Sequence, residues 1–215
     1  MEAEGDNHII RFIFTGEDGE VVPEDATHVT VDKSVTVIPE RAFYFHQNIL
    51  EFECHDGVEK VEEMAFYDCP FLRRVKMPGV KIVESEAFWC CKYLADVECD
   101  KLERIVWEAF FGCESLRSIN LPSIKIVEEG AFEYCTGLTD VKFGDKLERI
   151  EGRTFLNCKS LELIAIPLSN RIIDDRDDEA SYHDDVFQCC EDLKRVDLIG
   201  GVHENIAALH RVSNR

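Results

Sequence analysis

The chain has 215 residues, 45% of which are hydrophobic, and a formal net charge of −20 at pH 7. A chain of this length can bury roughly 70% of the surface that its unfolded form exposes, so one or two domains can fold without cross-links. The negative charge repels nucleic acids and anionic membrane surfaces, which disfavours both as ligands and favours basic partners or divalent cations.

The sequence contains no apolar stretch long enough to cross a bilayer. Residues 1–12 begin with acidic residues and lack the basic and apolar regions of a secretory signal. We therefore expect a cytoplasmic protein, with the nucleus as the alternative location. The ten cysteines are then expected to be reduced thiols.

Residues 1–25 are interpreted as an N-terminal capping segment. Between His8 and Thr15 apolar and polar residues alternate, with Ile10, Phe12 and Phe14 on one side. This alternation predicts a strand that covers the open end of the structure that follows.

Residues 26–198 form a repeat array. Seven phenylalanines recur every 22–23 residues, except for a last interval of 32. A cysteine follows six of them three residues later, His46 takes that place in the first unit, and a branched aliphatic residue comes six residues after each. The recurring residues are Phe43, Phe66, Phe88, Phe110, Phe132, Phe155 and Phe187. The array predicts seven to eight stacked units of 22–23 residues.

Each unit contains the pattern L-x-x-V-x-L, as in Leu116, Ile119 and Leu121. The last two apolar positions are two residues apart, so their side chains share one face of a strand. A second extended piece follows, and then A-F-x-x-C, which we expect to be a short helical turn. Glutamates precede this turn, where they would favour the positive end of a helix: Glu62, Glu84, Glu128 and Glu151.

These elements together predict an α/β repeat solenoid. We expect a right-handed superhelix with a parallel β-sheet on its concave face and short helical turns on its convex side. One unit cannot bury its apolar face alone, whereas stacked units share a continuous core.

The last unit contains an acidic insertion near residues 174–185. We interpret it as a solvated loop, with a cation site or a contact for a basic partner as alternatives. Residues 199–215 are interpreted as a C-terminal capping helix, because Glu204 to Arg211 has an amphipathic pattern with Ile206 and Leu209.

The run L-x-x-I-x-(L)P-x-x-V-x-x-I-x-x-x-A-F-x-x-C-x-x-L, over roughly residues 26–198, resembles the bacterial-surface-antigen (BspA-like) type of leucine-rich repeat. The resemblance implies non-catalytic repeats that bind proteins, with no catalytic residues and no cofactor. Many proteins of this type carry export signals, so the resemblance also implies a surface location as an alternative.

The outward positions of the strands are the expected binding face. The first three pairs of charges alternate in sign and should neutralise one another across neighbouring strands. From Ser118 onward this pairing stops, so we expect a partner between Asp96 and Leu163. The candidate binding residues are Arg74, Lys76, Asp96, Glu98, Ser118, Asn120, Asp140, Lys142 and Leu163.

A second candidate surface follows the residue after each recurring phenylalanine. This column is aromatic in four units: Tyr44, Tyr67, Trp89 and Phe111. Aromatic side chains are frequent anchors of protein interfaces. The alternative is that these rings stack on one another and only cover the core.

The cysteine column is interpreted as a ladder of packed free thiols. The sequence has no C-x-x-C motif and no histidine at ligand spacing, so no metal site is expected. Cysteine behaves as a small buried hydrophobic residue in such a setting. Cys90 and Cys189 lie outside the column and are expected to be exposed and reactive.

The sequence therefore predicts a non-catalytic protein-interaction module that is a monomer and needs no cofactor. Its partner is an unidentified protein, and a basic one is favoured by the charge. One alternative is an acidic inhibitor that occludes a basic enzyme. The other is a fragment of a surface or adhesion protein.

Overall fold

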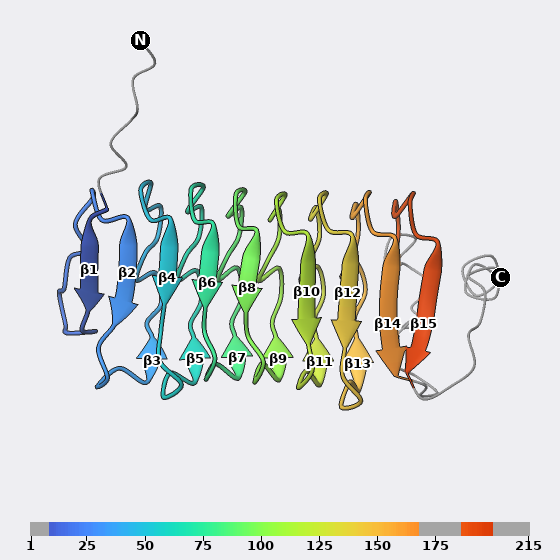
Figure 1. Cartoon of the computed structure of the whole chain (residues 1–215), viewed down its shortest axis with the longest axis horizontal. Coiled ribbons are helices and arrows are strands. Elements are labelled where there is room, and N and C mark those ends of the chain that lie inside the picture. The colour runs from blue at the N-terminus through green and yellow to red at the C-terminus, as the bar shows by residue number, and fades with distance from the viewer. Residues whose placement is uncertain (1–8, 168–185, 200–215) are drawn as a thin grey trace, which may run out of the picture.

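The computed structural model describes residues 9–167 and 186–199 of the chain. The chain winds through these residues as a parallel β-solenoid, and Figure 1 shows the successive coils side by side in a nearly straight row. The predicted repeat array is confirmed, because equivalent residues of successive units are partners on adjacent strands.

The longer strands lie along one face, which we call the strand face. Its first sheet has the order β1-β2-β4-β6-β8 and its second the order β10-β12-β14-β15. Strands β8 and β10 lie next to each other, so the second sheet continues the first (Figure 1). The strands are β1 (Arg11–Phe14), β2 (His28–Val31), β4 (Glu51–Glu53), β6 (Arg74–Lys76), β8 (Asp96–Glu98), β10 (Ser118–Leu121), β12 (Asp140–Phe143), β14 (Leu163–Pro167) and β15 (Arg195–Ile199).

A third sheet, made of two-residue strands, lies on the other side of the core from the strand face. Its order is β13-β11-β9-β7-β5-β3, so consecutive coils are again neighbours. Its strands are β3 (Val37–Ile38), β5 (Lys60–Val61), β7 (Ile82–Val83), β9 (Arg104–Ile105), β11 (Ile126–Val127) and β13 (Arg149–Ile150).

The recurring phenylalanines form a stacked ladder in the core. The ring centroids of Phe66 and Phe88 are 4.9 Å apart with the rings tilted by only 7°. Phe110 continues the ladder at 5.0 Å from Phe88 and 5.4 Å from Phe132. All of these rings are fully buried. One phenylalanine per coil thus fills the same space in each unit, and neighbouring coils complete each other's core.

The predicted helical turns are wrong. The described residues contain no helix, and A-F-x-x-C forms a tight turn with positive φ on both sides of the phenylalanine, as at Glu86 (φ 54°) and Cys90 (φ 54°). The amides of Glu86, Phe88 and Cys90 donate to carbonyls of the next coil, at 2.7–3.0 Å. An α-helix needs each of these amides for its own i→i−4 bonds, so bonding between coils replaces it.

The predicted role of the glutamates before this turn is also wrong, because there is no helix end to stabilise. They pair instead with bases of the third sheet. Lys60 lies 2.9 Å from Glu84, Arg149 lies 2.9 Å from Glu151, and Arg104 contacts a third glutamate of the set, Glu128. The pairs of Glu84 and Glu128 join neighbouring coils, whereas the pair of Glu151 lies within one coil.

The cysteine column is a buried ladder from Cys69 to Cys158, as predicted, and only Cys190 at its end is half-buried. Cys113 is fully buried, and its thiol donates a hydrogen bond to the carbonyl oxygen of Phe88 in the preceding coil (3.3 Å). Cys91 and Cys135 make the same contact to Phe66 and Phe110, at 3.1 Å each. A small side chain with a donor suits this position, because it fills the core and also satisfies a buried carbonyl.

At the N-terminal end, β1 pairs with β2 and buries Phe14, which agrees with the predicted covering strand. The acidic insertion near residues 174–185 and the predicted capping helix from Glu204 to Arg211 lie outside the described residues.

Candidate functional site

The charges on the strand face neutralise one another across neighbouring strands. The side chain of Arg74 lies 2.9 Å from Asp96, and that of Lys76 lies 2.8 Å from Glu53. The expected pairing of the first three strands is therefore present. Each of these side chains is about half exposed, so water screens the attraction.

More side chains between Asp96 and Leu163 have ion-pair partners than the sequence indicated. Asp96 is held by Arg74, and Lys142 lies 3.9 Å from Asp140 on its own strand. Ser118, Asn120 and Glu98 are exposed, whereas Leu163 is half-buried. The predicted binding residues thus share one face, but several already have partners within it.

The second candidate surface is the aromatic ridge, formed by Tyr44, Tyr67, Trp89 and Phe111. The Tyr67 and Trp89 ring centroids are 4.6 Å apart and nearly parallel, and Phe111 continues the stack at 5.4 Å from Trp89. Tyr44 begins the stack at 5.2 Å from Tyr67. The rings therefore do stack on one another, yet Tyr44 is exposed and the other three are only half-buried.

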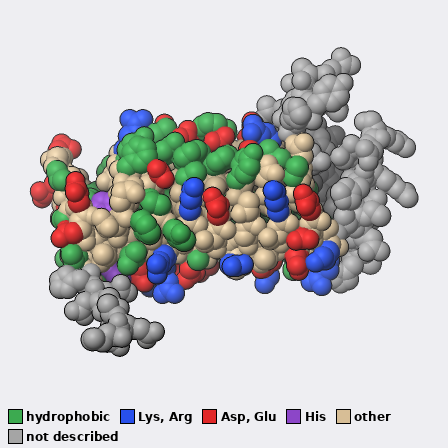
Figure 2. Space-filling model, turned by 90° about the horizontal axis from the view of Figure 1, so that it is seen from above, with side chains coloured by type: hydrophobic (Ala, Val, Ile, Leu, Met, Phe, Trp, Pro, Cys, Tyr) green, Lys and Arg blue, Asp and Glu red, His purple; other side chains and the backbone are tan. Residues whose placement is uncertain are grey.

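Further aromatic side chains beside the ridge escaped the sequence reasoning. Phe71 and Tyr93 stack on each other at 5.8 Å, five residues after their core phenylalanines. Figure 2 shows the solenoid from above, with hydrophobic side chains in a band along much of this side and charged side chains around them. A search for further aromatic columns could have found this pair. The large exposed aromatic side chains are Tyr44, Phe45, Phe71, Tyr93, Trp107 and Tyr134.

Half-buried carboxyl groups accompany the ridge. Burial and the nearby Glu63 raise the pKa of Glu86 above its ordinary value, although Arg41 opposes this. Burial and the neighbouring Glu133 and Glu86 likewise raise the pKa of Glu108. The nearby Arg153 and Trp89 act in the opposite direction and lower the pKa of Glu108.

Glu133 takes the place of an aromatic residue in the coil after Phe111. Its side chain is only 3% exposed, and Oε1 accepts a hydrogen bond from Arg153 at 3.0 Å. Burial raises the pKa of Glu133, and the Arg153 guanidinium only partly offsets this. A buried carboxylate with one cationic partner is an expensive arrangement, because the attraction between the two charges only partly offsets the loss of hydration.

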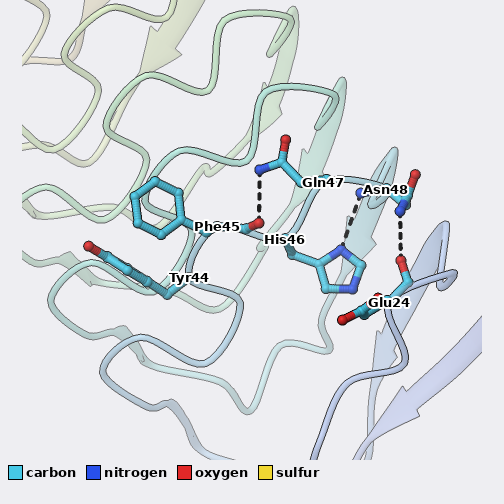
Figure 3. A pocket seen from close by; sticks show the side chains of 6 residues that line it. All are labelled: Glu24, Tyr44, Phe45, His46, Gln47 and Asn48. Atoms are coloured by element: carbon cyan, nitrogen blue, oxygen red, sulfur yellow. Dashed lines mark hydrogen bonds between the residues drawn. The ribbon is translucent and has the colours of Figure 1, made fainter.

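A hollow lies at the N-terminal end of the ridge, lined by Glu24, Tyr44, Phe45, His46, Gln47 and Asn48 (Figure 3). His46 Nε2 lies 2.9 Å from the carbonyl of Pro23, and its Nδ1 accepts from the amide of Asn48 at 3.3 Å. The imidazole thereby joins the first two coils. Both of its nitrogens are engaged within the chain, so this histidine is a structural substitute for the column cysteine.

The cysteines outside the column differ from each other. Cys189 is exposed, as expected, but Cys90 is half-buried, and burial raises the pKa of its thiol to about 11. Because the thiolate is the reactive form, the prediction that Cys90 is exposed and reactive is wrong. Within the described ranges, no three side chains of histidine, cysteine, aspartate or glutamate lie together as metal ligands.

The sequence family agrees with the architecture. Six copies of the BspA type leucine rich repeat region match residues 24–124 and 105–207, and the chain belongs to this family. No curated protein matches the chain. No helix in the described part of the chain is long and apolar enough to cross a membrane.

Solved structures show the same fold. A leucine-rich repeat protein from Bacteroides ovatus is 22% identical, with a TM-score of 0.65 over 80% of this chain and 42% of its own. The leucine rich repeat protein of T. pallidum is 18% identical, with a TM-score of 0.51 over 79% of this chain and 68% of its own. The chain thus spans less than half of the Bacteroides protein.

Proposed function

We propose that this protein is a non-catalytic protein-binding module that acts as a monomer, needs no cofactor and recognises a partner with a basic surface. The observation that carries this proposal is the stack of exposed and half-buried aromatic side chains that forms the aromatic ridge, with acidic groups beside it. Aromatic residues are strong interface anchors because they bury a large area at a small cost in conformational entropy.

Either face could hold the partner, and the aromatic ridge is the better supported one. On the strand face, Arg74, Lys76 and Asp96 already satisfy one another. A partner there would have to break these ion pairs before making new ones. The ridge offers apolar area without such a cost.

The first experiment tests the function itself. The full chain is immobilised and proteins are captured from a native lysate at low and at high salt, and each candidate is then purified and titrated against the chain by calorimetry. We expect a basic protein that binds with one-to-one stoichiometry and more weakly as salt rises. If none of the captured proteins binds the chain after purification, the proposal is wrong.

The second experiment compares the two faces with the purified partner. Trp89→Ala should weaken binding, whereas Asn120→Arg and Lys142→Glu should leave it unchanged. The reverse pattern would assign binding to the strand face, to the exposed Asn120 and its neighbours. All three positions are at least partly exposed, so each variant should fold.

An inhibitory role is a narrower form of the same proposal. An acidic solenoid that covers the active site of a basic enzyme would lower its activity in proportion to the occupancy. The captured partner's own activity, measured with and without the chain, separates inhibition from simple binding.

A cytoplasmic location forms part of the proposal, and it is supported by the thiol ladder. Cys91 and Cys113 donate hydrogen bonds that a disulfide would remove. Alkylation after denaturation without reductant should label all ten cysteines. The repeats also resemble the bacterial-surface-antigen type, so a surface protein is the second candidate; labelling of intact cells with an impermeant reagent would detect it.

A further inference from the structure

The aromatic ridge has a regular repeat of one ring per coil. The ring centroids are 5.2 Å apart from Tyr44 to Tyr67, 4.6 Å from Tyr67 to Trp89 and 5.4 Å from Trp89 to Phe111. This spacing follows from the distance of about 4.8 Å between neighbouring strands. A ligand that contacts every ring must therefore present a side chain about every 5 Å along the ridge.

An α-helix has this repeat. One turn advances it by about 5.4 Å and brings residues i, i+4, i+7 and i+11 to the same side, so the three ring spacings correspond to about three turns. An extended strand presents side chains on one face about every 6.6 Å, and a polyproline II helix completes a turn in about 9.3 Å. Both lose register with the rings within a few coils, so the repeat of the ridge favours a helix as its ligand.

Exposed rings extend the apolar surface at both ends of the ridge. Phe45 is 47% exposed and lies 4.4 Å from Tyr44, as Figure 3 shows, and Tyr134 is 44% exposed and lies 5.3 Å from Phe111. Both have a φ of 59°, which suits glycine and is costly for a bulky side chain. In the coils between them this position carries smaller residues: Asp68, Cys90 and Gly112. The two rings contribute no buried core, and their exposed surface is available to a partner.

Carboxyl groups lie close to the ridge. Glu86 and Glu108 precede their ridge residues by three positions and are half-buried. Burial first, and neighbouring carboxyl groups second, raise the pKa of both. Burial also raises the pKa of Tyr67, and the charges of Glu86 and, more weakly, Asp68 add to this effect. A cation beside these carboxyl groups would relieve their mutual repulsion.

The bases that act on this region already have acidic partners. The pairs are Arg41 with Glu40 at 3.2 Å, Lys92 with Glu114 at 3.8 Å and Arg153 with Glu133 at 3.0 Å. The charge around the ridge is therefore negative, as is that of the whole chain, with its net charge of −20. A basic ligand is attracted to this surface, whereas a second copy of the chain is repelled.

We propose that the aromatic ridge docks an amphipathic, basic α-helix of the protein partner. Apolar side chains at the spacing i, i+4, i+7 and i+11 contact the rings from Tyr44 to Phe111. Lysine or arginine side chains beside this apolar stripe lie near Glu86 and Glu108. The proposal rests on the protein-binding function above, and it names the structural element that the partner presents.

The test uses the full chain and three fluorescently labelled peptides of about 18 residues, or about five helical turns. The first places leucines at helical spacing among lysines and alanines. The second has the same composition, but its leucines alternate with the other residues as in a strand. The third keeps the helical pattern and replaces each lysine with glutamate. Anisotropy titrations measure the affinities, and circular dichroism measures the helicity gained on mixing.

The basic helical peptide should bind with one-to-one stoichiometry and gain helicity. The other two should bind at least about tenfold more weakly, because the alternating peptide loses register with the rings and the acidic peptide is repelled. Equal affinities of the two basic peptides would mean that charge alone drives binding, and this result would overturn the proposal. So would the absence of saturable binding by the basic helical peptide.

Variants of the chain locate the bound peptide. Trp89→Ala should weaken binding about tenfold, and Trp89→Phe, which keeps a ring, by less than about threefold. Ile13→Ala is the matched control, because it removes an exposed apolar side chain from β1 on the strand face, and it should leave binding unchanged. Glu86→Gln should weaken binding severalfold, and the exposed Glu98→Gln by less than about twofold. Equal losses in Trp89→Ala and Ile13→Ala would contradict docking on the ridge. Thermal unfolding checks the fold of each variant.

The native partner separates this inference from the function on which it rests. At saturation, the basic helical peptide should displace a purified partner whose binding is weakened by Trp89→Ala. If the peptide does not displace such a partner, the docked helix is wrong while the protein-binding function stands. If no captured protein binds the chain after purification, the protein-binding function is wrong even where the peptide binds.

Discussion

Two aromatic ladders run through the solenoid one residue apart in every coil, and they differ in uniformity. The inner ladder is phenylalanine throughout, and the described rings from Phe43 to Phe155 are all buried. The outer ladder changes from tyrosine to tryptophan to phenylalanine and then to Glu133. Both ladders stack at similar distances, 5.0 Å for Phe88 on Phe110 and 5.4 Å for Trp89 on Phe111.

The difference reflects which groups surround each ladder. The inner rings meet protein on every side, so a change in ring size leaves a void or a clash. The outer rings have solvent on one side and can change without disturbing the coils. The outer ladder therefore varies from coil to coil, whereas the inner ladder does not.

The largest expected effect is on the inner ladder. Phe110→Ala should lower the free energy of unfolding by about 3–5 kcal/mol, because it opens a cavity between two coils that cannot collapse. Urea denaturation followed by circular dichroism measures it. A loss below about 1 kcal/mol would mean that the inner ladder does not form the core.

The outer ladder should respond less. Trp89→Ala removes a half-buried ring and two stacking contacts, and should cost roughly 1–2 kcal/mol in the same measurement. A cost equal to that of Phe110→Ala would make the ridge a part of the core, and the contrast between the ladders would disappear.

The ion pairs of the strand face should matter least for stability. Arg74→Glu should change the free energy of unfolding by no more than about 1 kcal/mol, because Arg74 and Asp96 are both half exposed. Asp96→Asn serves as the control that removes the partner instead. A much larger loss would show that these pairs hold neighbouring coils together.

A pH titration tests the cost of burying the Glu133 carboxyl group beside Arg153. The pKa of Glu133 is raised above its ordinary value of 4.5, so the folded state holds its proton more tightly than the unfolded state. Glu133 therefore contributes less stability as pH rises through its raised pKa. Glu133→Gln should match the wild type at low pH and become the more stable of the two at neutral pH.

Urea denaturation of both proteins at several pH values measures this difference. The Glu98→Gln variant provides the baseline for loss of an exposed carboxylate. A Glu133→Gln variant that is less stable than the wild type at neutral pH would show that the ion pair with Arg153 outweighs the cost of burial.

The repeat spacing alone determined the coils, their register and the core. A phenylalanine every 22–23 residues, with a cysteine three residues later, allows only one arrangement in which every apolar position is covered by its equivalent in the next coil. The alternation of charges on Arg74 and Asp96 likewise predicted their pairing, since equivalent residues are neighbours on the sheet.

Only the tertiary structure decided the conformation of the turn and the nature of the ridge. Glu86 and Cys90 adopt positive φ because their amides gain partners in the next coil, and no local pattern reports on a partner 21 residues away. The packing around Gly130 involves side chains from three coils, because Glu108 and Glu133 lie against it and Arg153 bonds to Glu133. Their proximity arises from stacking, so the sequence around each one separately carries no sign of it.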